Sequence, residues 1–174
     1  MPIIAMEPAV KPAAMHTRSG VVGVLATSRT LASDNFVKLF ARYGADVEII
    51  GQACPGLVEQ VEAGDLSGDK TRALLEQYVQ PLLERGADTL VLGCTHYPFL
   101  APLIQEIAGA GVAVIDSAAA VARQLHRRLE VVDLLADETR VGTECFWTSG
   151  TLDKAEPLVS QLWQADVRLN LLSR

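Results

Sequence analysis

Strand-like and helix-like stretches alternate along most of the chain. The strand-like stretches are short and rich in Val, Ile and Leu or alternate in polarity, at residues 2–6, 20–27, 46–50, 89–92, 111–117 and 144–148. The helix-like stretches space apolar side chains three or four residues apart, at residues 7–14, 31–43, 70–85, 99–108, 117–125 and 152–163. Strand–helix–strand units of this length favour parallel pairing. The pattern predicts an α/β fold with an open parallel-type sheet flanked by helices.

Reactive side chains gather where the apolar run 89–92 ends. Gly93 allows a turn, and Cys94-Thr95-His96 then places a thiol, a hydroxyl and an imidazole side by side. Pro98 suits the first turn of the helix that follows. Ligands of open α/β sheets bind at such strand-to-helix junctions, where helix N–H groups are free. We therefore expect a functional site here.

Cys94 has two readings. A helix N-terminus and a neighbouring imidazolium both favour the thiolate, which can act as a base or a nucleophile. Alternatively, Cys94 is a small buried apolar residue, as free cysteines often are. The adjacent Thr95 and His96 are hard to explain as packing, so the functional reading is favoured.

Composition narrows the class of protein. The chain has 174 residues, of which 49% are hydrophobic and 5% aromatic, enough for one good core or two small ones. A formal net charge of -6 disfavours nucleic acid or anionic membranes as partners. No run reaches the ~18 apolar residues of a membrane span, and the first residues do not resemble a signal peptide, so a cytoplasmic location is expected. The three cysteines, an odd number, do not suggest a disulfide framework.

Three segments resemble the bacterial glutamate racemases. Residues 92–98, Leu-Gly-Cys-Thr-His-Tyr-Pro, resemble the second signature of that family, and 52–64 resemble its A-C-P-x-L-V-x-x-V-E-x-G segment. The segment that contains Glu7-Pro8-Ala9 resembles the family segment with the I-x-x-x-x-E-P-A pattern, which joins its two domains. Aspartate racemases typically carry Glu at the position of His96, so His96 favours the glutamate branch. The resemblance implies cofactor-independent interconversion of L- and D-glutamate for peptidoglycan synthesis.

The resemblance also implies roles for individual residues. Cys94 matches the second of two catalytic thiols that flank the α-carbon. Thr95 and His96 would bind substrate, with His96 also supporting proton exchange at Cys94. Glu62 matches an auxiliary acidic residue, although a solvated glutamate near a helix end is its commoner reading. Cys54 is interpreted as a packed structural residue. No cofactor and no metal are implied.

The match covers part of the family's pattern. Residues 1–115 correspond to the second racemase domain, and 116–174 to a carboxyl-terminal segment that packs on the first domain. The first-domain C-N-T motif, with its partner thiol, has no counterpart in the sequence. We therefore expect the chain alone to be inactive. Glutamate is the expected ligand, and both a homodimer and association through the exposed first-domain interface are open.

Other readings of the Cys94 loop remain. A non-catalytic α/β module could use it to bind an anion or a partner. A metal or redox site on Cys94-x-His96 would need further ligands, and neither His16 nor His126 offers an obvious completing pair. A racemase for another amino acid is disfavoured by His96. A cysteine hydrolase would need an oxyanion-hole sequence, and none is recognisable near Cys94.

Overall fold

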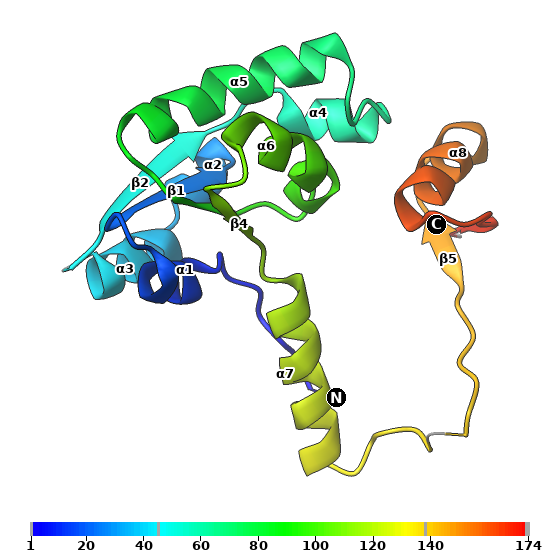
Figure 1. The fold of residues 1–174 in the computed structure, drawn as a ribbon. Coiled ribbons are helices and arrows are strands. Elements are labelled where there is room, and N and C mark those ends of the chain that lie inside the picture. The colour runs from blue at the N-terminus through cyan, green and yellow to red at the C-terminus, as the bar shows by residue number, and fades with distance from the viewer. Residues whose placement is uncertain (1, 45, 138, 173–174) are drawn as a thin grey trace.

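The centre of the molecule is a four-stranded parallel sheet. The computed structural model describes residues 2–44, 46–137 and 139–172. The strands lie in the order β2-β1-β3-β4 (Figure 1). Their bounds are β1 (Val21–Ala26), β2 (Glu48–Ala53), β3 (Thr89–Leu92) and β4 (Ala113–Ile115). The predicted α/β fold with an open parallel sheet is confirmed.

Helices cover both faces of the sheet (Figure 1). Those on one face are α4 (Leu57–Glu62), α5 (Asp69–Glu84) and α6 (Ala101–Ala108), and those on the other are α1 (Val10–His16) and α3 (Asp34–Tyr43). Successive residues of a strand point to opposite faces, so Leu90 joins the first core and Val91 the second. Because both faces are buried, the central strands are apolar apart from the buried Thr89 at the start of β3.

The structure differs from the predicted elements in three places. Residues 2–6 form no strand, because an extended segment needs a strand to pair with and this one has none within the described sheet. The predicted helix 31–43 begins only at Asp34, as α3, and a separate short helix, α2 (Ser28–Leu31), precedes it. Ser33 separates them, because its hydroxyl caps α3 by accepting a hydrogen bond from the Phe36 N–H at 3.3 Å. The helix after Cys94 begins with a 3-10 turn, η1 (Tyr97–Leu100).

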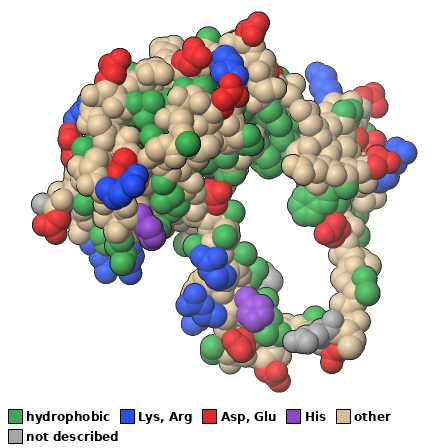
Figure 2. Space-filling view, in the orientation of Figure 1, with side chains coloured by type: hydrophobic (Ala, Val, Ile, Leu, Met, Phe, Trp, Pro, Cys, Tyr) green, Lys and Arg blue, Asp and Glu red, His purple; other side chains and the backbone are tan. Residues whose placement is uncertain are grey.

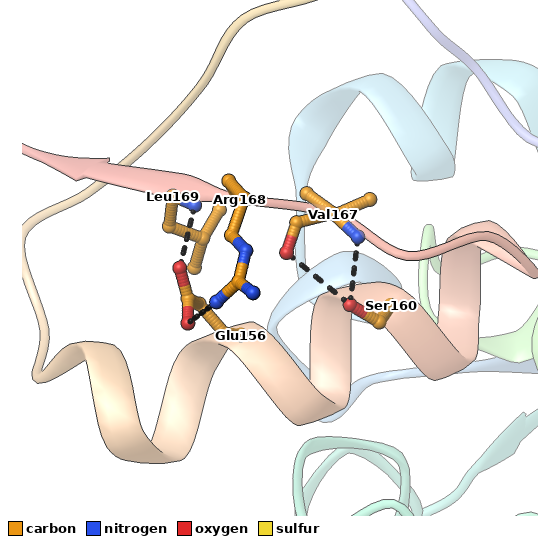
Figure 3. Close-up of polar contacts among 5 residues, drawn as sticks. All are labelled: Glu156, Ser160, Val167, Arg168 and Leu169. Atoms are coloured by element: carbon orange, nitrogen blue, oxygen red, sulfur yellow. Dashed lines mark hydrogen bonds and ion pairs between the residues drawn. The ribbon is translucent and has the colours of Figure 1, made fainter.

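Beyond β4 the chain leaves the sheet along α7 (Ala118–Val131), which buries none of its residues (Figure 1). An irregular connection leads to β5 (Phe146–Thr148), α8 (Leu152–Trp163) and β6 (Leu169–Leu171), of which β6 was not predicted. β5 and β6 pair in parallel. The Glu156 carboxylate of α8 anchors β6 by accepting a hydrogen bond from the Leu169 N–H at 2.9 Å. The Ser160 hydroxyl accepts a hydrogen bond from the Val167 N–H (Figure 3).

An open gap lies between the sheet, α7 and the unit formed by β5, α8 and β6, and hydrophobic side chains lie along its sides (Figure 2). The unit touches the sheet's helices through α8, where Gln161 donates a hydrogen bond to the carbonyl of Gly64 at 3.0 Å. Within the described ranges, every helix is too short or too polar to cross a membrane.

Candidate functional site

A cleft of about 370 Å³ lies where β1, β3 and β4 end. Parallel strands deliver the loops that follow them to one edge of the sheet, so these loops form the walls. The polar residues from these loops that line the cleft are Thr27, Thr30, Cys94, Thr95, Asp116 and Ser117. The sequence-predicted junction after β3 therefore opens onto a cavity large enough for a small polar ligand.

Gly93 lets the Cys94 loop run close to β1. Its N–H donates a hydrogen bond to the Leu25 carbonyl at 2.8 Å. A Cβ at this position would lie 3.1 Å from both the Leu25 carbonyl oxygen and the Ala26 Cβ, closer than side-chain contacts usually allow. The glycine thus fixes the direction in which the chain leaves the sheet and enters Cys94.

The structure brings together Cys94, His96 and Glu62. The Cys94 Sγ lies 3.8 Å from Nδ1 of His96, and the Thr95 hydroxyl lies 3.4 Å from the same nitrogen. On the other side of the ring, Nε2 of His96 lies 3.4 Å from Oε1 of Glu62. With Nε2–H directed at the carboxylate, Nδ1 is the acceptor that faces the thiol. The arrangement can move a proton between sulfur and imidazole.

Glu62 reaches His96 because of how α4 is packed. Leu57 and Val61 are fully buried in the core between the helices and the sheet, and they fix the orientation of the short helix. Glu62 is its last residue and projects from the surface, where its side chain is 63% exposed and that of His96 is 33% exposed. Water therefore reaches this end of the proton path.

The other two cysteines lie elsewhere. Cys54 is 2% exposed and packs in the core, as interpreted from the sequence. Burial, together with the nearby Cys94, raises the pKa of the Cys54 thiol to about 12, so it stays protonated at neutral pH. Cys145 is exposed on the connection before β5. Among the described residues, Cys94 alone brings a thiol to the lining of the cleft.

Three contributors to the cleft were not predicted from the sequence. Asp116 and Ser117 follow β4 directly, and the edge rule applied to Cys94 would have found them. Asp116 also caps α7 by accepting a hydrogen bond from the Ala118 N–H at 2.7 Å. Glu7 reaches the cleft from the irregular segment before α1. The E-P-A pattern includes Glu7, but it was interpreted as the segment that joins two domains and not as part of the site.

The described residues contain no group of three or more His, Cys, Asp or Glu side chains placed to hold a metal ion. His16 is exposed at the end of α1, where its Nδ1 lies 2.7 Å from the Pro12 carbonyl oxygen. His126 is exposed on α7. Neither histidine is part of the Cys94 cleft.

The sequence matches a known family and is similar to known proteins. The model of the Asp/Glu/Hydantoin racemase family matches residues 1–125. The chain is 55% identical over 168 residues to glutamate racemase of Pseudomonas entomophila, covering 97% of this chain and 63% of that protein. It is 55% identical over 163 residues to glutamate racemase of Pseudomonas aeruginosa, covering 94% and 61%.

Solved structures of glutamate racemases share the fold of this chain. Escherichia coli glutamate racemase, in complex with L-glutamate and the activator UDP-MurNAc-Ala, superposes with a TM-score of 0.81 at 29% identity, over 99% of this chain and 65% of that one. Thermus thermophilus glutamate racemase, in complex with β-chloro-D-alanine, gives a TM-score of 0.67 at 31% identity, over 94% and 61%. The resemblance to glutamate racemases read from residues 92–98 is confirmed.

Fold and site together define a parallel α/β protein with a thiol and an imidazole at the carboxyl edge of its sheet. The chain belongs to the Asp/Glu/hydantoin racemase family. It spans 61–63% of the length of the first curated relatives it matches.

Proposed function

We propose that this chain forms part of a glutamate racemase and supplies one of the two thiols that exchange the α-proton of glutamate. The observation that carries the proposal is the contact of 3.8 Å between the thiol of Cys94, which lines the cleft, and the imidazole of His96 beside it. The glutamate racemases among its relatives support glutamate as the substrate. Peptidoglycan precursor synthesis in the cytoplasm is the corresponding cellular role.

The chemistry requires two groups on opposite faces of the α-carbon. The Cys94 thiolate removes the α-proton from one face and leaves a planar carbanion, and a second thiol returns a proton to the other face. Exchange of a proton with His96 restores Cys94 between turnovers. Thr95 and His96 hold the substrate's polar groups, and Glu62 orients the imidazole from the far side. No cofactor takes part in this scheme.

We further propose that the 174-residue chain alone does not racemise glutamate. Of its three cysteines, Cys54 is buried behind the site and Cys145 lies on an exposed connection. The partner thiol would then come from outside these 174 residues. In this scheme residues 1–115 act as one racemase domain and 116–174 as the segment that packs on the other.

The surface around the gap favours a protein partner. The described residues of α7 and the connection after it include exposed apolar side chains at Leu125, Val131, Val132, Leu134 and Leu135. A group of exposed apolar side chains is typical of a surface that another domain or subunit covers. We propose that the occupant is a first racemase domain, and that self-association through the same surface is the competing arrangement.

The test is reconstitution. The purified chain is assayed for D-glutamate formation and for exchange of the α-hydrogen in deuterated water, alone and mixed with the first domain of the Pseudomonas entomophila enzyme. We expect no turnover alone and turnover in the mixture, with Cys94→Ser abolishing it. Cys94-dependent turnover by the chain alone would overturn the proposed incompleteness.

Binding measurements separate the remaining alternative. Isothermal titration with glutamate is run on the chain and on the mixture, with Thr95→Val as the variant that loses a cleft hydroxyl. Glutamate binding without exchange of the α-hydrogen in either sample would indicate a non-catalytic binding module and would contradict the racemase assignment.

A further inference from the structure

Two buried tyrosines hold the turn that leads into α4. The Tyr97 hydroxyl donates a hydrogen bond to the Cys54 carbonyl at 3.2 Å, and the Tyr78 hydroxyl donates one to the next carbonyl, that of Pro55, at 2.7 Å. Tyr97 belongs to η1 and is fully buried, and Tyr78 belongs to α5 and is 6% exposed. Two adjacent carbonyls are thus tied to two different elements.

The tyrosine hydroxyls are the donors to these two carbonyls. The turn ends at Gly56, whose φ of +89° departs from both strand and helix geometry. In the described part of the chain, no backbone N–H donates to the carbonyl of Cys54 or Pro55. Cys54 is buried, and a buried carbonyl without a donor is unfavourable, so the Tyr97 hydroxyl fixes the turn at this residue. Pro55 is exposed, so its carbonyl depends less on the Tyr78 hydroxyl.

The Tyr97 bond joins the two segments that carry the candidate site. Tyr97 directly follows His96, and the turn it holds leads into α4, which ends at Glu62. The contact between His96 and Glu62 is itself exposed to water, and ion pairs of that kind do little to hold two loops together. The geometry of the pair therefore has to come from buried contacts behind it.

We propose that Tyr97 is a positioning residue, whose hydroxyl ties the Cys94-Thr95-His96 loop to the turn before α4 and so keeps Glu62 within reach of the His96 imidazole. A catalytic role for the pair of His96 and Glu62 rests on the proposed function, but the hydrogen bond of Tyr97 does not. Burial, then the neighbouring Cys54 and Cys94, raises the pKa of Tyr97 well above its ordinary value. Its hydroxyl thus remains a donor at any pH at which a thiol exchanges protons.

The test compares Tyr97→Phe with Tyr78→Phe in the purified chain. Both variants remove one buried hydroxyl from the same turn, but only Tyr97 links the turn to the His96 loop. The readouts are the alkylation rate of Cys94 by iodoacetamide, measured by peptide mass spectrometry, and the imidazole NMR signals of the three histidines. Cys145, His16 and His126 are internal references. Neither readout needs turnover, so the result is independent of the racemase assay.

We expect Tyr97→Phe to slow Cys94 alkylation about threefold and to move the His96 signals, because a displaced imidazole supports the thiolate less. Tyr78→Phe should leave both readouts unchanged. His96→Ala should slow alkylation too, and adding Tyr97→Phe to it should have no further effect. Equal effects of the two tyrosine variants, or additive effects with His96→Ala, would reduce Tyr97 to a packing role and overturn the proposal.

A measurement on the unmodified chain covers the case in which Tyr97→Phe does not fold. A hydroxyl proton donated to a buried carbonyl exchanges slowly with water, so Tyr97 should show one, with a nuclear Overhauser contact to the Hα of Cys54. Detection of the Tyr78 hydroxyl proton but not of the Tyr97 proton would contradict the bond on which the proposal depends.

Discussion

The side-chain amide of Gln161 donates a hydrogen bond to the backbone carbonyl of Gly64, across 97 positions of sequence. Gly64 lies two residues after Glu62, so the bond fastens α8 to the end of the helix that carries the candidate carboxylate. The contact is close: a Cβ at Gly64 would lie 2.8 Å from Oε1 of Gln161. The carboxyl-terminal unit is thus docked beside the site at a position whose φ of +76° favours glycine.

Gly64→Ala should therefore release α8. Gly64 has a φ of +76°, so alanine strains the backbone and also meets Gln161, and we expect the free energy of unfolding to fall by about 2 kcal/mol. Hydrogen exchange in α8 should rise. Gly86→Ala is the matched control, because Gly86 has a φ of +85° and a Cβ at its position would have no neighbouring atom within 4 Å. Equal losses in the two variants, with α8 still protected, would show that the contact with Gln161 is unimportant.

The sequence was informative where a local pattern determines the structure. The run 89–92 followed by Gly93 predicted both the central strand and the loop after it that lines the cleft, because a strand buried on both faces is mostly apolar. Glu62 was assigned to its helix end correctly, but its meeting with His96 depends on how α4 packs across 34 positions of sequence. Only the family resemblance, and no residue pattern, singled it out.

Longer-range relationships were not predictable in this way. Residues 2–6 have the composition of a strand, but a strand forms only beside a partner, and the order of the sheet is set by distant segments. β6 was missed for the opposite reason. Its three residues are too few to show a period, and its position depends on Glu156 and Ser160 of α8.

Glu156→Ala tests the attachment of β6. Glu156 accepts a hydrogen bond from the Leu169 N–H at 2.9 Å, and its other oxygen lies 3.7 Å from a guanidinium nitrogen of Arg168. Loss of the carboxylate leaves the Leu169 N–H without its acceptor, so we expect about 1 kcal/mol of destabilisation and faster amide exchange in β6. Arg168→Ala removes an exposed ion pair and should change neither. A larger effect of Arg168→Ala would contradict this account. Urea titration and hydrogen exchange provide the measurements.

Asp88→Asn tests a carboxylate at the opposite edge of the sheet from the cleft. Asp88 accepts hydrogen bonds from the Thr17 hydroxyl at 2.6 Å, the N–H groups of Arg18 and Ser19 at 2.7 and 2.9 Å, and the Thr89 hydroxyl at 3.0 Å. Burial opposes its ionisation, but these bonds outweigh it and hold the pKa of Asp88 well below its ordinary value. We expect the variant to lose about 2 kcal/mol at pH 7.

The sign of the pH dependence of this loss follows from the lowered pKa of Asp88. A depressed pKa in the folded state stabilises the fold above the unfolded pKa of about 3.9, and the stabilisation disappears as the pH falls further. The difference between the original chain and Asp88→Asn should therefore shrink below about pH 4. Asp137→Asn is the comparison, because hydrogen bonds from Thr139 lower the pKa of Asp137 too, but on an exposed turn, so its difference should be small at every pH. A difference for Asp88→Asn that stays constant down to pH 2 would contradict the assignment.

Cys54→Ala tests the buried thiol behind the site at alkaline pH. Removal of the sulfur from the core should cost about 1 kcal/mol at pH 7. The pKa of Cys54, raised to about 12 by burial, stabilises the fold only below the unfolded thiol's pKa of about 8.5. Above that pH the original chain should lose about 1.4 kcal/mol per pH unit relative to the variant. The two free energies of unfolding, measured in urea under reducing conditions, should then become equal between about pH 9 and 10. Parallel curves over this range would mean that the Cys54 thiol ionises as readily in the folded chain as in the unfolded one.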